Sequence, residues 1–416
     1  MRQALPPSSS RLLFLGSCTL VASIPLVLLA LRLPATSTFL QRAVDRASGR
    51  TKEKKQRPRA LPPASLHVHV ALKGVTVRES DIVLLRSLLH PSITLTHGDE
   101  VDPLTQVLVA NFPSKELLAR LAPTLRALIF PFAGVPLPFL AHCATVHPHL
   151  SVHNLHHNAP PTAEMGLTLL LAAAKCLLPA DAQLRRGDWR AGGGPSLNVT
   201  MREEAAGQLI LEGKQALILG YGEVGRRLAQ SCLGLGMTVK AMRRTGGRGG
   251  GREGGREGGA VEMVGKEGWR EELPRTTALL LALPGTASTE NLVGESELRL
   301  LPKEAVVVNV GRGTAVHEEG LYKVLTEGRI HGAGLDVWWQ YPTEHEPHMP
   351  PSRFPFHELP NVVMSPHRAG AAGVGESETR RMEALAALIN DGWQGGKEGG
   401  KEGGAMRNRV WVDRGY

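Results

Sequence analysis

Residues 215–229 read QALILGYGEVGRRLA, in which a short apolar run, three spaced glycines and the start of a helical pattern follow one another without a break. The motif is G-x-G-x-x-G, and the apolar run Ala216–Leu219 precedes it. In a dinucleotide-binding unit the first glycine permits the tight turn, the second lets the pyrophosphate approach the backbone, and the third lets helix and strand pack closely. Alone the motif also fits a turn that binds no nucleotide, but the preceding strand and following helix favour a dinucleotide site. The backbone N–H groups at the start of the helix would point at the phosphates, and the helix dipole would favour their negative charge. The predicted contacts are Gly220, Gly222, Glu223, Val224 and Gly225.

The basic charge of the chain is concentrated at its N-terminus. The formal net charge is +9, and residues 1–64 hold 11 Lys and Arg against 2 Asp and Glu, which leaves 37 basic and 37 acidic residues in the remainder. This neutral remainder offers no basic face, so we expect no nucleic-acid partner. The four cysteines are scattered without paired spacing, which argues against a disulfide framework or a zinc site and favours a reducing compartment. No metal is expected. The cysteines are Cys18, Cys143, Cys176 and Cys232.

The leader, residues 1–64, combines two kinds of segment. Leu12–Leu31 carries no charge and is long enough to span a bilayer or to act as the apolar region of a signal peptide. Residues 35–59 are rich in Ser, Thr and Arg and poor in acid, as organelle transit segments are. An apolar signal followed by such a segment resembles the bipartite presequences of plastids enclosed by extra membranes, so we expect delivery to a plastid. A membrane anchor at residues 12–31 is the alternative, with the body facing the cytosol.

The segment 65–160 alternates short apolar runs with helical patterns, which predicts a parallel sheet covered by helices. The loop FAGVP at residues 132–136 follows an expected strand end, where open α/β sheets place ligand loops, although by itself it also fits an ordinary loop. Histidines before the next helix, His156 and His157, are expected on the surface, with a place in the lining of a cleft as the alternative, and they lack the i, i+4 spacing of a zinc pair. Thr162 is expected to cap that helix.

The second strand of the dinucleotide unit ends at Met242 and is followed by Arg243 and Arg244. An NAD site usually has Asp or Glu there for the ribose 2′-OH, whereas Arg favours a 2′-phosphate. We therefore expect NADP as the preferred cofactor, with NAD as the alternative. The glycine-rich stretches 246–259 and 395–404 cannot bury a core and are expected to be flexible surface insertions.

Three polar residues stand at the ends of later apolar runs. Arg312 follows EAVVVNVG, Asp336 follows HGAGL, and His367 follows NVVMSP. Carboxyl ends of strands in a doubly wound sheet meet at one crevice, so these side chains should converge. Arg312 offers a bidentate clamp for a carboxylate, and His367 is the natural proton donor or acceptor near neutral pH.

From about Leu66 to Tyr416 the sequence resembles the D-isomer-specific 2-hydroxyacid dehydrogenase family. The resemblance rests on ordered motifs: FAGV, RRGDW, GYGEVG, LP-x-T-x-x-T, NVGRG, GLDV, SPH and a terminal VDRGY. It implies an α/β fold of two doubly wound parallel-sheet domains, with a Rossmann dinucleotide-binding domain inserted in a discontinuous flavodoxin-like substrate domain, and a homodimer. The implied boundaries are a leader at 1–64, the first segment of the substrate domain at 65–160, the dinucleotide-binding domain at 161–366, and the second segment of the substrate domain, with the C-terminal tail, at 367–416.

The resemblance also implies roles for individual residues. Arg312 matches the arginine that binds the substrate carboxylate and carbonyl, and His367 matches the acid/base. Ala133 and Gly134 match the backbone N–H pair that grips the carboxylate, and Asp336 matches the residue that faces the nicotinamide amide. The further cofactor contacts implied are Leu283 and Pro284 beside the adenine, Thr289 near the phosphates, and Val310 and Gly311.

One position departs from the family. A glutamate five residues beyond the Asp of the DV motif pairs with the histidine and keeps it protonated, and Tyr341 occupies that place here. A histidine without a carboxylate partner has a lower pKa, so less imidazolium is available to protonate a 2-oxo acid. Formate dehydrogenases carry a glutamine at the position of Tyr341, whereas here the glutamine, Gln340, lies one position earlier. Glu344 or Glu346 in the following loop is a candidate substitute.

The leading hypothesis is an oxidoreductase that moves hydride between NAD(P)H and a small 2-oxo or 2-hydroxy acid. A cofactor-sensing binding protein that has lost turnover is the first alternative, favoured by Tyr341 and opposed by the intact Arg312 and His367. Formate oxidation, in which the glutamate is dispensable, is the other. Membrane contact is expected only through the leader.

Overall fold

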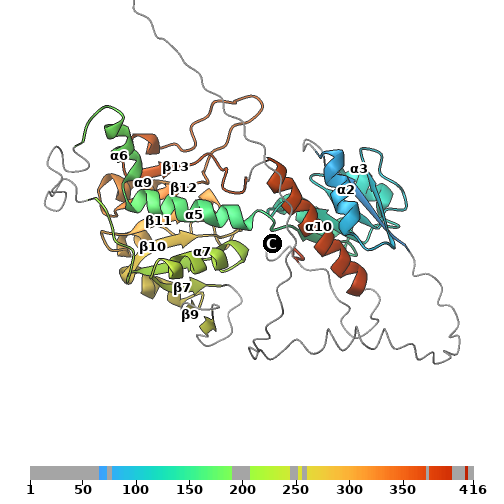
Figure 1. The fold of residues 1–416 in the computed structure, drawn as a ribbon, viewed down its shortest axis with the longest axis horizontal. Coiled ribbons are helices and arrows are strands. Elements are labelled where there is room, and N and C mark those ends of the chain that lie inside the picture. The colour runs from blue at the N-terminus through green and yellow to red at the C-terminus, as the bar shows by residue number, and fades with distance from the viewer. Residues whose placement is uncertain are drawn as a thin grey trace, which may run out of the picture. The chain divides into compact units, whose positions relative to one another are not determined.

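The computed structural model describes residues 65–72, 77–189, 207–243, 252–254, 260–371, 374–395 and 408–410. The leader, Arg244, most of both glycine-rich stretches and the terminal VDRGY therefore lie outside the described residues. The described residues form one compact unit that holds two sheets. Both sheets are built mainly from parallel strands with helices on their faces, which confirms the predicted α/β class (Figure 1).

The first sheet has five parallel strands in the order β2-β1-β3-β4-β5. Its central strands β3 and β4 are buried along their whole length, as expected for a sheet covered on both faces. The last helix, α10, packs against α2 of this sheet although the two lie at opposite ends of the chain (Figure 1). The domain boundaries themselves stay a prediction. The elements are β1 Leu66–Ala71, α2 Glu79–Leu88, β2 Ile93–His97, β3 Val107–Ala110, α3 Lys115–Leu121, β4 Ala127–Phe130, α4 Leu137–Val146, β5 Ser151–Asn154 and α10 Val374–Gly395.

The second sheet has eight strands in the order β13-β12-β11-β10-β6-β7-β9-β8. All pair in parallel except the edge strand β8, which is antiparallel to β9. β8 lies within the glycine-rich stretch 246–259, three residues of which pair with β9 at the edge of the sheet. The strands are β6 Gln215–Leu219, β7 Thr238–Met242, β8 Arg252–Gly254, β9 Ala260–Val264, β10 Thr276–Leu281, β11 Val306–Asn309, β12 Gly332–Leu335 and β13 Val362–Met364.

Alternate residues of β6 serve the two faces of this sheet. Ala216 and Ile218 pack with α5 and α7, whereas Leu217 and Leu219 pack with α8, α9 and η3. The chain leaves β6 towards β7 and returns on the other side of β6 at β10, which creates a switch point at the carboxyl ends of β6 and β10. The helical elements are α5 Ala159–Ala174, α6 Leu177–Leu184, α7 Glu223–Gly234, η3 Gly268–Arg275, α8 Glu295–Leu300, η4 Gly313–Ala315, α9 Glu318–Thr326 and η5 Phe356–Glu358.

Helix α5 begins earlier than expected. Asn158 is its N-cap, and Pro160 and Pro161 follow Ala159 in the first turn, which suits the fixed proline backbone. Thr162 lies inside the first turn and donates from Oγ1 to the Asn158 carbonyl at 2.7 Å. Its predicted capping role is therefore wrong.

Among the described residues no single helix has the length and apolar composition to cross a membrane. Helices α5 and α6 together have the length and apolar composition of a membrane span, but they are bent by 65° at the break between them. α5 buries Leu169, Leu170 and several alanines in the core beside β11 and β12, so protein packing accounts for its apolar character. The apolar stretch at residues 12–31, for which a membrane anchor is the alternative to a targeting signal, lies outside the described part of the chain.

Candidate active site

The three glycines of the turn after β6 have different surroundings. Gly220 has a φ of +101°, and a Cβ there would lie 2.5 Å from the Ala282 carbonyl oxygen. A Cβ on Gly225 would overlap the carbonyl of Gly220, which lies across the turn. A Cβ on Gly222 would meet no atom within 4 Å, because that position faces the cavity. The first and third glycines are therefore required by the protein, and the second leaves space for a ligand.

Helix α7 begins at this turn with its N-terminus open. Gly222 is the N-cap and supplies no side chain to the first backbone N–H groups of the helix. Such groups, with the helix dipole, suit a pyrophosphate. Glu223 at the first position pairs with Arg226 and, at 2.8 Å, with Arg227. These hydrogen bonds, that of Arg227 first, hold the pKa of Glu223 below its usual value. The two arginines thus neutralise the carboxylate that would otherwise repel a phosphate.

Two loops approach each other closely beside this turn. A Cβ on Gly311 would lie 2.6 Å from the backbone nitrogen and oxygen of Leu283, so only glycine fits there. Thr289 donates from Oγ1 to the Pro284 carbonyl at 2.6 Å and accepts from the backbone N–H of Thr286 at 2.9 Å. The predicted cofactor residues Leu283, Pro284 and Thr289 are therefore held as one rigid corner. A dinucleotide fits the site, because an open glycine, uncapped helix N–H groups and this corner border one cavity.

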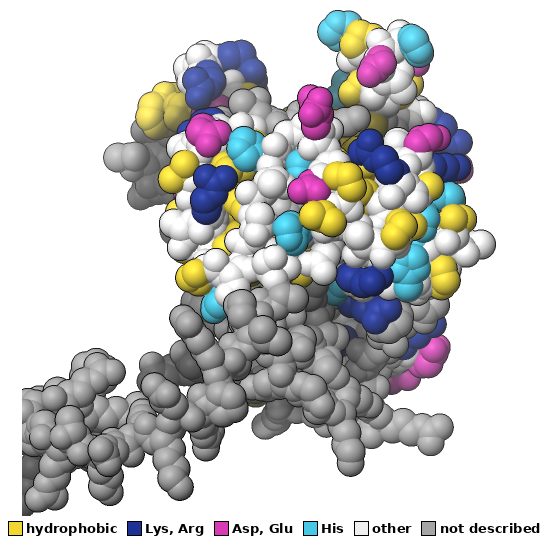
Figure 2. Space-filling view, turned by 90° about the vertical axis from the view of Figure 1, so that its right-hand side faces the viewer, with side chains coloured by type: hydrophobic (Ala, Val, Ile, Leu, Met, Phe, Trp, Pro, Cys, Tyr) yellow, Lys and Arg dark blue, Asp and Glu magenta, His cyan; other side chains and the backbone are white. Residues whose placement is uncertain are grey.

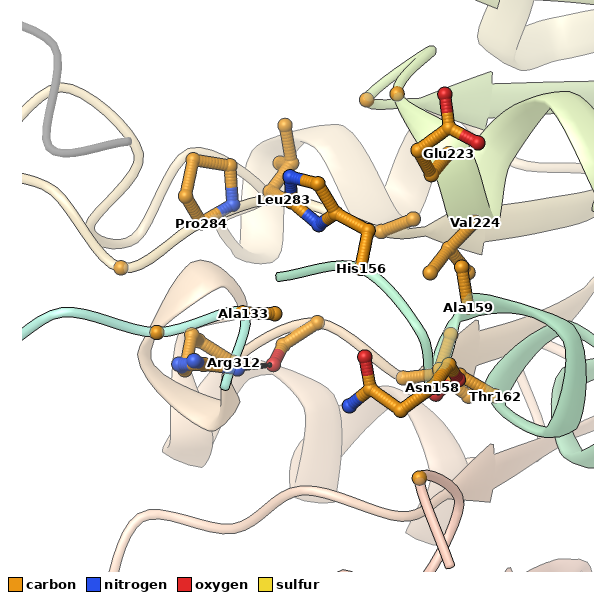
Figure 3. Close-up of a pocket in the computed structure, with 18 of the residues that line it drawn as sticks. Ala133, His156, Asn158, Ala159, Thr162, Glu223, Val224, Leu283, Pro284 and Arg312 are labelled. Carbon is orange, nitrogen blue, oxygen red and sulfur yellow. Dashed lines mark hydrogen bonds between the residues drawn. The ribbon is translucent and has the colours of Figure 1, made fainter. Parts of the chain in front are cut away.

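Arg312 is oriented by the strand end that carries it. The Asn309 side chain accepts from the Gly311 N–H at 3.0 Å and donates to the Arg312 carbonyl at 2.9 Å. The Arg312 Nη1 donates to the Gly311 carbonyl at 2.7 Å, and a Cβ added to Gly134 would lie only 2.6 Å from Nη2. The guanidinium thus abuts the loop predicted to grip a carboxylate, as Figure 3 shows for Ala133 and Arg312. Burial lowers the pKa of Arg312 from its usual high value.

His367 stands on a turn that Asp336 fixes. Its backbone is left-handed, with a φ of +53°. The buried Asp336 carboxylate accepts from the Ser365 hydroxyl and from the backbone N–H groups of Arg368 at 2.9 Å and Ala369 at 3.0 Å. These bonds engage both carboxylate oxygens, so Asp336 holds the histidine turn. Its implied contact with a nicotinamide amide stays a prediction.

Burial against the cavity walls lowers the pKa of His367 from its ordinary value of 6.5. The nearby Arg312 charge lowers that pKa further, and the Asp336 charge acts in the opposite direction. Tyr341 occupies the expected position of the carboxylate partner, with its ring centroid 5.3 Å from that of His367. The Tyr341 hydroxyl accepts from the Trp338 N–H at 3.0 Å. An aromatic ring therefore replaces a counter-ion beside the histidine, while Glu344 and Glu346 lie on the exposed loop beyond it.

These groups line a single cavity of about 770 Å³. Of the described candidate residues, only Gly225, beneath the turn, and Tyr341, behind His367, are absent from its wall. Arg244 lies outside the described residues. The candidates in the wall are Ala133, Gly134, Gly220, Gly222, Glu223, Val224, Arg243, Leu283, Pro284, Thr289, Val310, Gly311, Arg312, Asp336 and His367.

Sequence reasoning missed several residues of the wall. His156 projects into the space near Leu283 and Pro284, and His157 also borders the cavity, so the favoured surface position is wrong and the alternative, a place in the lining of a cleft, is confirmed (Figure 3). Lys266 follows β9, and Arg381 lies on α10. The strand-end pattern that located Arg312 and His367 could have found Lys266. No sequence pattern singles out a cavity residue within a long helix such as α10.

The fold and cavity define an α/β protein with a dinucleotide-binding domain. The family model of the D-isomer specific 2-hydroxyacid dehydrogenase NAD binding domain matches residues 167–369. Curated glyoxylate reductases are similar: that of Thermococcus litoralis is 32% identical over 233 residues, and that of Aeropyrum pernix is 36% identical over 232 residues. Each match covers 55% of this chain and 61% of the relative, so the chain spans about three fifths of these relatives' length. Residues 167–369 thus match the NAD binding domain of the D-isomer specific 2-hydroxyacid dehydrogenase family, and the chain is similar to curated glyoxylate reductases over 55% of its length.

Solved structures share the fold at lower identity. A D-isomer specific 2-hydroxyacid dehydrogenase from Xanthobacter autotrophicus Py2, in complex with NADPH and MES, has a TM-score of 0.64 at 23% identity. It is matched over 84% of this chain and 99% of its own. The NADPH-dependent glyoxylate/hydroxypyruvate reductase of Sinorhizobium meliloti has a TM-score of 0.61 at 21% identity, with 85% and 100% covered.

Proposed function

We propose that this protein is an NAD(P)H-dependent reductase of small 2-oxo acids, acting reversibly on the corresponding 2-hydroxy acids. The observation that carries the proposal is that Arg312, His367 and the open glycine turn border the same cavity. A guanidinium for a carboxylate, an imidazole for a proton and a dinucleotide cradle are the three elements that such a reaction needs.

The chain's residues have separable tasks in this proposal. Arg312 and the backbone N–H groups of Ala133 and Gly134 bind the substrate carboxylate and place its neighbouring carbonyl. The turn at Gly222 and the corner at Leu283 hold the cofactor, which when bound supplies the hydride. His367 donates the proton from its imidazolium to the carbonyl oxygen as the carbonyl is reduced, and takes it back in the reverse direction. Overall, one 2-oxo acid, one NAD(P)H and one proton give one 2-hydroxy acid and NAD(P)⁺.

Substitution at the two predicted catalytic side chains tests the proposal. NADPH consumption with glyoxylate and hydroxypyruvate should be lost in Arg312→Ala and in His367→Ala. Exposed Lys303→Ala, outside the cavity wall, is the matched control and should retain wild-type rates. Undiminished activity in both cavity variants would contradict the assignment.

NADP is our proposed preference over NAD. Arg243 borders the cavity directly after β7, where an NAD site has an acidic residue, and Lys266 borders it after β9. Replacing Arg243 and Arg244 by Asp and Ser should shift the kcat/KM ratio towards NADH. An unchanged ratio would remove the proposed phosphate contact.

A cofactor-sensing binding protein is the competing function. Tyr341 beside His367 favours it, because the histidine lacks the counter-ion that would keep it protonated. Tight NADPH binding without turnover of any 2-oxo acid would support the sensor. NAD⁺ reduction with formate alone would support formate oxidation.

We also propose a homodimer. Helix α6 buries none of its residues, and Leu177 and Leu178 are 55% and 46% exposed. Exposed apolar groups of this kind suit a subunit contact. Leu177→Glu with Leu178→Glu should give a monomer in sedimentation, whereas Val83→Glu on α2, an equally exposed apolar position at 54%, should leave the dimer intact. A wild-type monomer would contradict the proposal.

For the leader, we propose a plastid presequence, with an anchor at residues 12–31 as the alternative. N-terminal sequencing of the protein from its native cells separates them. Removal of about the first 64 residues would support the presequence, and an intact Met1 in a membrane fraction would support the anchor.

A further inference from the structure

His156 faces the cavity from the segment that joins β5 to α5. Its side chain projects into the open space on the side of the cavity where Glu223 begins α7 (Figure 3). The charges of Glu223, Arg226 and Arg227 all act on its imidazole, so the ring lies within electrostatic range of the first turns of that helix. A side chain from the end of the first sheet therefore stands across the cavity from the turn at Gly222, which is open to a ligand.

The hydrogen-bonding groups of this imidazole are unused and accessible. His156 makes no side-chain hydrogen bond or ion pair with any other residue that the structure describes. Its side chain is half-buried, and neither ring nitrogen is enclosed by protein atoms. The neighbouring His157 differs in this respect, because its Nδ1 is enclosed. A group bound in the cavity can therefore reach His156 directly.

In the free protein this imidazole is mainly neutral near pH 7. Burial lowers the pKa of His156 below its ordinary value of 6.5, Glu223 opposes this change, and Arg226 and Arg227 lower the pKa further. The adjacent His157, with its pKa lowered to about 4, is neutral as well, and the corner formed after β10 carries no titratable side chain. An anion bound beside the ring would stabilise the imidazolium and raise the pKa of His156.

We propose that His156 binds the pyrophosphate of the dinucleotide as an imidazolium, so that binding of the cofactor takes up one proton from solvent. This inference rests on the proposed function only in requiring that the cavity binds a dinucleotide. The N–H groups at the start of α7 and the imidazolium would hold the pyrophosphate from opposite sides. His156 is then a positioning residue for the cofactor, and it acts from the segment after the first sheet and not from the glycine turn.

Linkage fixes the sign of the pH dependence. A group whose pKa is higher in the complex than in the free protein strengthens binding fully below its free pKa. That gain is lost as pH rises through the pKa of the complex. Affinity for the dinucleotide should therefore be greater in mild acid than in mild alkali.

ADP-ribose is a suitable probe, because it has the adenosine and the pyrophosphate but neither the nicotinamide nor a 2′-phosphate that titrates near neutrality. Titration calorimetry in two buffers of different ionisation enthalpy measures both the Kd and the protons taken up. The wild-type protein should bind ADP-ribose about tenfold more tightly at about pH 5.5 than at about pH 8.5, because a shift of one pKa unit corresponds to a tenfold change in affinity. Net proton uptake should accompany binding between these two values. The pKa of Glu223 lies below its usual value, so its titration falls outside this range.

Three substitutions of cavity histidines separate their contributions. His156→Gln keeps a polar side chain that cannot become a cation, so it should lose most of the pH dependence and the proton uptake, and approach the wild-type Kd at about pH 8.5. His157→Gln is the matched control, because it changes the adjacent histidine, which is neutral over this range, and it should retain the wild-type pH dependence. His367→Gln should retain it too, because ADP-ribose lacks the reacting part of the cofactor.

Equal wild-type affinity at the two pH values, or a pH dependence that persists in His156→Gln, would overturn the imidazolium contact while leaving the dinucleotide site standing. A loss of affinity by the same factor at both pH values in His156→Gln would reveal a neutral contact and would also overturn the proton uptake. A wild-type protein that binds neither ADP-ribose nor NADPH would overturn the proposed function, and this inference with it.

Discussion

Restoring a carboxylate beside His367 should move the pH dependence of reduction upwards. In the wild type the pKa of His367 is below 6.5, chiefly through burial, and the proton donor for reduction is the imidazolium. Reduction should therefore be fastest at acidic pH and decline as pH rises through this lowered pKa. Oxidation of the hydroxy acid uses the neutral ring and should show the opposite trend.

Tyr341→Glu places an anion about as far from the imidazole as the tyrosine ring, whose centroid is 5.3 Å away. Coulomb attraction over about 5 Å is worth roughly 3 kcal/mol at an effective dielectric constant of 20 and about 0.8 kcal/mol in water. His367 is open to the cavity, so an intermediate value of about 1.4 kcal/mol applies, which equals about one pKa unit.

The assay is the pH profile of kcat/KM for a 2-oxo acid with saturating NADPH, measured in both directions of the reaction. The Tyr341→Glu profile should be displaced by about one pH unit to higher pH. Tyr341→Gln, of the same size as Glu but neutral, controls for loss of the ring and of the contact with the Trp338 N–H. If the Glu and Gln profiles coincide, or if the Glu profile moves to lower pH, our account of this position is refuted.

Three further sets of substitutions test other regions of the site. Gly222→Ala should keep the wild-type melting temperature, because its Cβ meets no protein atom, but should weaken NADPH binding about tenfold or more, because that Cβ occupies the space proposed for the cofactor. Gly225→Ala should lower the free energy of unfolding by about 2–4 kcal/mol, because its Cβ meets a backbone carbonyl. Calorimetry and cofactor titration separate the two, and a stable, tight-binding Gly225→Ala would contradict the packing argument. Arg312→Lys should lower kcat/KM by about 100-fold through loss of the bidentate geometry, and a wild-type value would show that a point charge suffices. Arg226→Gln should weaken NADPH and NADH binding alike, whereas Arg227→Gln, which is outside the cavity wall and removes only a partner of Glu223, should weaken both less; equal effects of the two would exclude a direct phosphate contact of Arg226.

The fold and the chemical core of the site were predictable because they depend on short, local signals. The glycine turn fixes a strand and a helix, and polar residues after buried strands must meet at one sheet edge. Arg312 and His367 were found in this way, without any knowledge of the loops between them. The same reasoning gave the parallel sheets, because their runs are continuously apolar.

The remaining features depend on contacts between distant segments, for which the sequence carries no periodic signal. Asp336 stands at the expected strand end. Its hydrogen bonds to Ser365 and Ala369 accompany a left-handed backbone conformation at His367, which no sequence motif predicts. His157 is followed by a helix start and resembles a surface residue until the cavity is seen to reach it. The substitution at Tyr341 was evident from the sequence, whereas its ring contact with His367 was not.

The packing of α10 on α2 also affects how the chain is made. Met382, Leu385 and Ile389 of α10 pack in one hydrophobic cluster with Val68 of β1 and Ile82 of α2. Figure 2 shows the side of the molecule on which this first sheet lies. A ribosome releases the early segments long before the late ones, so one side of the N-terminal sheet stays uncovered while the whole nucleotide-binding sheet is being synthesised. During translation the apolar side chains of β1 and α2 that α10 later covers therefore stay exposed to solvent. We expect the nascent chain to need chaperones most until α10 has been synthesised.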